Sequence, residues 1–194
     1  MARTGDAPLA PDARAALADL ARRSIAAGLE VPWLEFDLAA LPPRLAAPGA
    51  SFVSLHRAGR LRGCMGRLEA TRPLAEDVAG NARAAAFFDP RFPPLAADEM
   101  ADLGLEISIL GPAHDLPVRD EAELLAALRP GIDGLILHEA GPRGARRATF
   151  LPSVWRQLPD PLAFARGLEQ KAGLPPGSWS PTRRYQRYEV ESIR

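Results

Sequence analysis

The segment with the clearest chemical potential spans residues 61–67 and reads LRGCMGR, with Cys64 at its centre. Glycine permits positive φ and the close approach of another backbone, and guanidinium groups near a thiol favour the nucleophilic thiolate. The flanking residues would therefore suit a reactive cysteine: they are the glycines Gly63 and Gly66 and the arginines Arg62 and Arg67. The same spacing also describes a small apolar residue in a tight turn, so the sequence leaves both interpretations of Cys64 open.

A nucleophilic thiol needs a neighbouring base, which a histidine could supply. The three candidates are His56, His114 and His138. His56 is the best placed, because a predicted hairpin puts it on the same face as Cys64, whereas the other two fall in a loop and at a strand end. Glu106 could orient the base or pair with Arg62. We expect an Arg62–Glu106 ion pair beside Cys64, because a lone charge in an apolar strand is costly.

The remaining patterns argue against several function classes. One cysteine and three scattered histidines give no metal-ligand spacing, and no phosphate-binding glycine loop follows a predicted strand, so we expect no metal or cofactor. Lys+Arg 24 balances Asp+Glu 24, which disfavours a surface devoted to nucleic acid. Residues 183–188, RRYQRY, interleave cations with aromatics as single-strand binders do, but we favour an ordinary edge strand.

The composition also bears on the compartment. A single cysteine cannot form an intrachain disulfide, and the N-terminus lacks the apolar segment of a secretory signal. No apolar run approaches the ~20 residues that a membrane-spanning helix needs. We therefore expect a cytoplasmic protein with no membrane partner.

A β-hairpin is expected to position Cys64. Residues 51–56 and 60–64 are typical of short strands, and 57–59 would form a three-residue loop ending at Gly59, where positive φ is cheapest. In this register the facing pairs are His56 with Arg60, Ser54 with Arg62, and Phe52 with Cys64. The opposite face is then uniformly apolar, with Val53, Leu55, Leu61 and Met65. Cys64 should project away from the core.

The other elements alternate irregularly along the chain. Helical patterns cover 12–29, 73–88, 120–128 and 160–173, and strand patterns cover 103–110, 134–138, 149–151 and 183–193. The hairpins favour an α+β fold, a mainly antiparallel sheet flanked by helices with a smaller helical/β subdomain. At 194 residues we expect one domain, 1–194, with residues 1–10 as a flexible tail.

Several segments together resemble one family. Residues 61–66 resemble the L-R-G-C-I-G signature of the AMMECR domain family, whose bacterial members are called AmmeMemoRadiSam system protein A. Further blocks agree in order. They are D-P-R-F-P-P at 89–94, the E-x-S-V-L strand at 105–110, F-L-P-x-V at 150–154, and K-A-G-L at 171–174 followed by Trp179. Met65 replaces the usual isoleucine, and residues 145–149 depart from the usual R-G-T before Phe150.

The resemblance implies an α+β fold and a three-component system. The implied partners are a Memo-like protein of the extradiol-dioxygenase fold and a radical SAM protein, which would hold the iron and the Fe–S cluster. A link to RNA modification has also been suggested for the family. The resemblance thus implies that this chain is component A of such a system, with an activity that the motifs do not define.

Two hypotheses about the Cys64 surface follow. In the enzyme hypothesis, Cys64 is a nucleophile or covalent carrier, His56 the base and Glu106 the orienting carboxylate. Arg62 and Arg91, the latter in the proline-rich loop 89–94, would bind an anionic substrate. Amides near Gly63 and Gly66 would stabilise an oxyanion. In the alternative hypothesis, the surface is a non-catalytic module that receives a small ligand or a partner chain.

Overall fold

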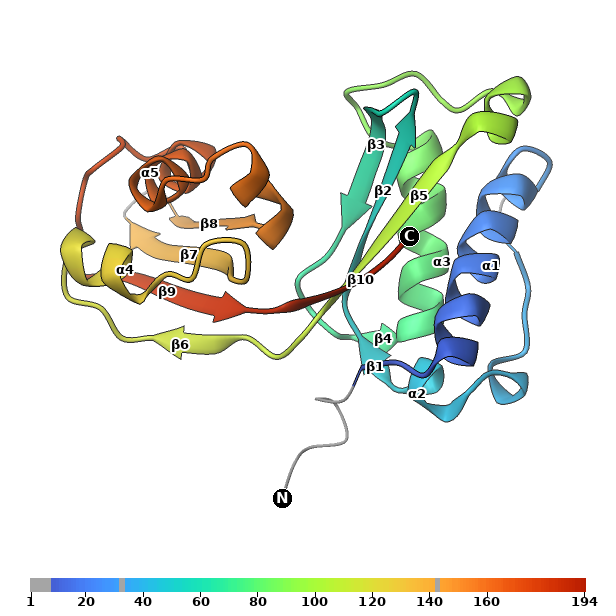
Figure 1. Ribbon diagram of the computed structural model, residues 1–194, viewed down its shortest axis with the longest axis horizontal. Helices are drawn as coiled ribbons and strands as arrows, with labels where there is room; N and C mark the ends of the chain where they lie inside the picture. The colour runs from blue at the N-terminus through green and yellow to red at the C-terminus, as the bar shows by residue number, and fades with distance from the viewer. Residues whose placement is uncertain (1–7, 32–33, 142–143) are drawn as a thin grey trace. The chain divides into compact units, whose positions relative to one another are not determined.

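The computed structural model describes residues 8–31, 34–141 and 144–194, which form two compact units (Figure 1). Unit 1 comprises Met1–Leu110 with Glu191–Arg194, and unit 2 comprises Gly111–Val190. The α+β class is confirmed, with helices packed on antiparallel sheets. Within the described ranges, no helix combines the length and apolarity needed to cross a bilayer.

Unit 1 is built on a four-stranded sheet. In spatial order its strands are β10 (Val190–Ile193), β5 (Gly104–Leu110), β2 (Ser51–Arg57) and β3 (Arg60–Gly66). β2 pairs antiparallel with both β3 and β5. Helix α3 (Leu74–Phe87) packs against β2 and β3, and α1 (Pro11–Gly28) packs against α3 (Figure 1). β3 is therefore an edge strand.

Smaller elements connect these parts of unit 1. They are the 3₁₀ helices η1 (Leu38–Ala40) and η2 (Ala97–Asp102), helix α2 (Pro43–Ala46), and the paired short strands β1 (Pro48–Gly49) and β4 (Arg72–Pro73). The sequence patterns assign no element to η2, which proves important for the site. Proline at the first positions of α1 and α2 presets the helical φ, which explains where these helices begin.

The core of unit 1 lies between its sheet and its helices. The fully buried side chains include Leu17 and Ile25 of α1, Val53 and Leu55 of β2, and Ile107 of β5. α3 contributes mainly alanines, whose small side chains let the helix lie close to the sheet. Of the tail expected over 1–10, residues 1–7 lie outside the described residues. Leu9 is buried, and its N–H donates to the Glu191 carboxylate at 3.0 Å, so the core begins at Leu9.

The predicted hairpin exists, but its predicted register is wrong. The loop has two residues, Ala58 with φ 48° and Gly59 with φ 75°, which is the type I′ geometry favoured by the twist of the strands. A β-bulge between Leu55 and His56 then adds one residue to β3, so that Ser54, not Phe52, pairs with Cys64. Turn and bulge together shift the pairing by two residues, which preserves the face on which Cys64 lies.

Unit 2 holds a second four-stranded sheet. Its strands in spatial order are β6 (His114–Leu116), β9 (Arg183–Tyr188), β7 (Gly134–Gly141) and β8 (Gly144–Phe150). Helices α4 (Glu121–Ala127) and α5 (Pro161–Lys171) and the 3₁₀ helix η3 (Pro152–Arg156) complete it. The rings of Trp155 and Phe164 stack in its core, with centroids 3.7 Å apart. Asp120 caps α4, as predicted, by accepting the N–H of Glu123.

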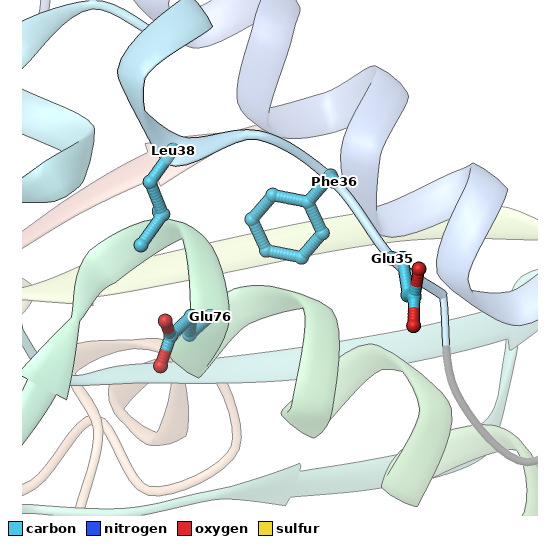
Figure 2. Close-up of a pocket in the computed structure, with 4 residues that line it drawn as sticks. All are labelled: Glu35, Phe36, Leu38 and Glu76. Carbon is cyan, nitrogen blue, oxygen red and sulfur yellow. The ribbon is translucent and has the colours of Figure 1, made fainter.

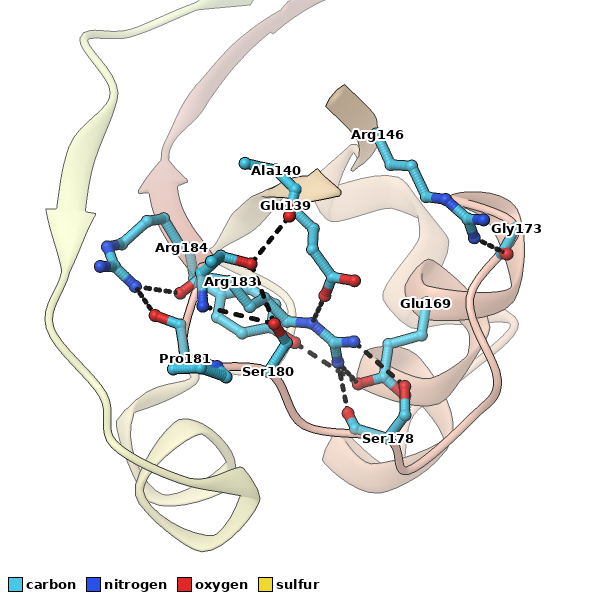
Figure 3. Close-up of polar contacts among 12 residues, drawn as sticks. Glu139, Ala140, Arg146, Glu169, Gly173, Ser178, Ser180, Pro181, Arg183 and Arg184 are labelled. Atoms are coloured by element: carbon cyan, nitrogen blue, oxygen red, sulfur yellow. Dashed lines mark hydrogen bonds and ion pairs between the residues drawn. The ribbon is translucent and has the colours of Figure 1, made fainter. Parts of the chain in front are cut away.

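The strand predicted over 183–193 is two strands, β9 in unit 2 and β10 in unit 1. β9 lies between β6 and β7, so it is an inner strand rather than the expected edge strand. Figure 3 shows why an arginine is tolerated there: buried Arg183 donates to Glu139 at 2.7 Å, to Glu169 at 2.6 Å and to the Ser178 carbonyl. These acceptors satisfy a charge that would be costly if left alone.

Candidate functional site

Cys64 belongs to a row of polar side chains across the sheet of unit 1. Register places Cys64 of β3 opposite Ser54 of β2, and Ser54 opposite Glu106 of β5. Their strand neighbours Val53 and Leu55 are fully buried in the helix-covered core, so the row lies on the other face of the sheet. Cys64 is partly exposed, and its Sγ accepts a hydrogen bond from Ser54 Oγ at 3.3 Å. The predicted face of Cys64 is confirmed.

The loop after α3 holds the main chain of Cys64. Asp89 accepts the Cys64 N–H at 2.8 Å, and Arg91 Nη2 donates to the Cys64 carbonyl at 3.4 Å. Arg91 also donates to both carboxylate oxygens of Asp89, at 2.9 and 2.6 Å. An edge strand normally leaves such peptide groups unpaired. This ion pair therefore takes the place of a neighbouring strand and fixes the position of Cys64.

Asp89 is kept ionised by this arrangement. The hydrogen bonds that Arg91 donates hold the pKa of Asp89 far below its ordinary value of 3.8, and the Cys64 N–H adds to the effect. Burial acts in the opposite direction and is outweighed. The sequence patterns marked Asp89 only as a helix stop. The sequence signal that could have indicated this role is the position of Asp89, directly after a helix and at the start of the proline-rich loop 89–94.

Arg62 does not pair with Glu106, so the predicted ion pair is wrong. Arg62 donates to Glu99 through Nε and Nη2, each at 2.8 Å, whereas Glu106 accepts from Arg194 at 3.1 Å. The bulge carries Arg62 out of the row, and η2 presents Glu99 to it. Hydrogen bonding by Arg62 lowers the pKa of Glu99 from 4.5 to about 2.

Gly63 and Gly66 are required by packing. A Cβ on Gly63 would lie 2.0 Å from the carbonyl oxygen of Ala85 in α3. A Cβ on Gly66 would lie 2.3 Å from the ring of Phe52 and 2.5 Å from the carbonyl oxygen of Ser51. Neither glycine has a positive φ. Gly63 is therefore explained by the close approach of α3 to β3, and Gly66 by the close approach of the neighbouring strand β2. Their amides as oxyanion donors stay a prediction.

The histidines are distributed over both units. His56 lies two residues from Ser54 on β2 and so shares its face, although no hydrogen bond joins His56 to Cys64 within the described part of the chain. His114, expected in a loop, begins β6, and His138 lies in β7 with Nε2 at 3.2 Å from Gln186 Oε1. His56 is thus the histidine that the fold places on the Cys64 face in unit 1.

No group of three or more metal-ligating side chains occurs among residues 8–31, 34–141 and 144–194. A pocket of about 500 Å³ lies elsewhere in unit 1, lined by Glu35, Phe36, Leu38 and Glu76 (Figure 2). It contains none of the residues of the Cys64 row. The sequence patterns did not single out Glu35, Phe36 and Leu38, because isolated apolar and acidic residues in a proline-rich connection carry no distinctive spacing. Glu76 comes from the first turn of α3.

Known proteins are similar to this chain over most of its length. A family model described as AMMECR1 matches residues 18–193. A protein of Methanothermobacter thermautotrophicus is 37% identical over 142 residues, which cover 72% of each chain. Protein LS215_2104 of Saccharolobus islandicus is 37% identical over 142 residues, which cover 71% of this chain and 61% of that protein. The crystal structure of the uncharacterised protein PH0010 from Pyrococcus horikoshii matches with a TM-score of 0.86 and 30% identity, covering 95% of this chain and 92% of that one.

Proposed function

The chain belongs to the AMMECR1 family, and from that premise we propose that it is the substrate-binding component of an AmmeMemoRadiSam-type system. Its partners in this proposal are a Memo-like protein and a radical SAM protein, as the sequence resemblance implies. The substrate would be a small anionic molecule that binds on the sheet face carrying Cys64. The Cys64 thiol would be the group that contacts the bound substrate.

One observation carries this proposal: three sequence blocks of the family meet at Cys64. The block at 61–66 supplies the thiol, the block at 89–94 holds its peptide through Asp89 and Arg91, and the block at 105–110 supplies Glu106 in the same row. The ion pair satisfies the peptide groups of an edge strand and at the same time holds the residue that carries the thiol. The convergence supports a site whose purpose is to hold Cys64 in one place.

The geometry divides the candidate residues by role. Arg62 has Nε and Nη2 committed to Glu99, and its side chain is only 12% exposed, so we assign it to positioning the segment after the bulge. Arg91 has a side chain that is 56% exposed and engages Asp89 through Nε and Nη2. Its Nη1 makes no hydrogen bond in the described part of the chain, so Arg91 keeps a donor for an anionic ligand. His56 and Glu106 lie on the same face of the sheet as Cys64, and we assign them the roles of base and orienting carboxylate.

A second function, a module that binds a ligand without forming a bond, is favoured by a different observation. His56 makes no hydrogen bond to Cys64 in the described part of the chain, and the direct partner of the thiol is the hydroxyl of Ser54. A hydroxyl is a weak base and would not by itself activate a thiol. In this alternative the same face binds the ligand and presents it to a partner protein.

The test is to co-express the chain with the Memo-like and radical SAM proteins of its own genome and to identify bound small molecules by mass spectrometry. We expect a small anionic molecule to copurify with the wild type and to be lost from Cys64→Ala. Met65→Leu is the matched control, because Met65 is the next residue and pairs with buried Val53, away from the Cys64 face. Equal retention of the molecule by Cys64→Ala would contradict the site, and failure of the three proteins to associate would contradict the system.

A further inference from the structure

Two arginines converge on one buried carboxylate at the end of the unit 1 sheet. Arg67 follows the last residue of β3, Arg72 lies in β4, and Asp77 lies in the first turns of α3, a region seen in Figure 1 where β3 leads to α3. Nε of Arg67 and Nε of Arg72 each lie 3.2 Å from the same oxygen, Oδ1 of Asp77. The two guanidinium groups are therefore neighbours.

The carboxylate between them is rigidly held. Oδ2 of Asp77 accepts the Ser51 N–H at 2.8 Å, the Ser51 hydroxyl at 2.7 Å and the Asn81 side-chain amide at 2.8 Å. The Asp77 side chain is fully buried, and Ser51 and Asn81 are buried as well. A buried carboxylate with this many donors has one fixed position, so it fixes the Nε atoms of both arginines.

The terminal nitrogens of the two arginines are left for another partner. Both contacts with Asp77 use Nε, and no hydrogen bond or ion pair joins either guanidinium group to another residue in the part of the chain that the structure describes. The side chains of Arg67 and Arg72 are 45% and 27% exposed, so a solute can reach them. Two cations share one carboxylate, and their mutual repulsion falls when a second anion binds between them.

Gly80 places the Arg72 guanidinium against helix α3. A Cβ at this position would lie 2.8 Å from Nη2 of Arg72 and 3.4 Å from its Cζ. A side chain at position 80 would displace the end of Arg72 from this place. The orientation of Arg72 is therefore determined by both Asp77 and the helix surface, which lowers the entropy that a ligand must overcome.

We propose that Arg67 and Arg72 form a binding site for the phosphate group of a small ligand. Two neighbouring forks of N–H donors match an anion with several oxygens better than a planar carboxylate, which one arginine satisfies alone. The site differs from the arginines near Cys64, whose Nε and Nη2 atoms already donate to Glu99 and Asp89. It stands independently of the function proposed for Cys64.

Calorimetric titration of the full chain with inorganic phosphate tests the site, with phenyl phosphate as a second arm that distinguishes a phosphate ester from the free ion. We expect saturable binding of at least one of them and about tenfold weaker binding by Arg67→Gln, because a charge-assisted hydrogen bond is lost. Arg60→Gln is the matched control, since Arg60 is an exposed arginine at the other end of β3. It should bind like the wild type.

Gly80→Ala provides a variant that keeps every charge. Alanine favours the helix but displaces the flexible end of Arg72, so the fold should persist while phosphate binding weakens. Thermal unfolding checks that each variant is folded. Unchanged affinity in Gly80→Ala and Arg67→Gln, or no saturable binding to the wild type below about 10 mM, would overturn the proposal. Cys64→Ala should retain phosphate binding, which separates this test from that of the Cys64 site.

Discussion

At the scale of single residues, most charged groups around Cys64 hold the structure in place. Asp89 and Arg91 satisfy the N–H and carbonyl of Cys64, and Arg62 with Glu99 fixes the bulge next to it. The sequence suggested that Arg62 and Arg91 both bind an anionic substrate. In the structure, each of them already donates hydrogen bonds to a carboxylate of the protein. The side chains on the sheet face of Cys64 include those of Ser54, His56 and Glu106, of which Glu106 accepts from Arg194.

The Arg62–Glu99 ion pair should make the free energy of unfolding depend on pH in the acidic range. The pKa of Glu99 is lowered from 4.5 to about 2 by the hydrogen bonds of Arg62, so between these values the unfolded chain binds more protons than the folded chain. The contribution is complete above about pH 4.5 and is lost as the pH falls toward about 2. Urea unfolding of the wild type should show this loss. Glu99→Gln should have a flatter profile, and parallel profiles would contradict the assignment.

At the scale of elements, the hairpin of β2 and β3 decides where Cys64 lies. Its type I′ turn places Ala58 at φ 48°, in the left-handed region where a Cβ is unfavourable. Asparagine tolerates this region, and Asn-Gly is a preferred type I′ pair.

We therefore expect Ala58→Asn to raise the free energy of unfolding by roughly 0.5–1 kcal/mol. Chemical denaturation measures the difference. Ala47→Asn is the matched control, because exposed Ala47 has φ −74° and should gain nothing. A gain of the same size at both positions would show that the turn is not the cause.

The sequence was sufficient for the fold class and for the face of Cys64, because apolar alternation along β2 and β5 determines which side is buried. It was insufficient for the hairpin register, because alanine gives no signal for positive φ and a bulge leaves no compositional mark. The partner of Arg62 was missed for a related reason. Glu99 lies in a short 3₁₀ helix without periodicity, and only the folded chain brings it to Arg62.

At the scale of the whole molecule, unit 2 is inserted within unit 1. The chain leaves unit 1 after Leu110 and returns at Glu191, so the last strand, β10, completes the first sheet. Glu191 then binds the N–H of Leu9 and the side chain of Arg14, which ties the C-terminal segment to the start of α1. The sheet that carries Cys64 therefore includes the C-terminal strand β10, next to β5.

The central claim, that this fold holds Cys64 as a reactive, ligand-facing thiol, can be measured directly. Cys64 is the single cysteine, so alkylation by iodoacetamide reports on this residue alone. Its partial exposure, its hydrogen bond from Ser54 and the nearby Arg91 guanidinium should all favour reaction in the folded state. We expect the folded chain to react faster than the urea-unfolded chain at pH 7, and Arg91→Gln to reduce the difference. A folded rate below the unfolded rate at every pH would contradict the claim.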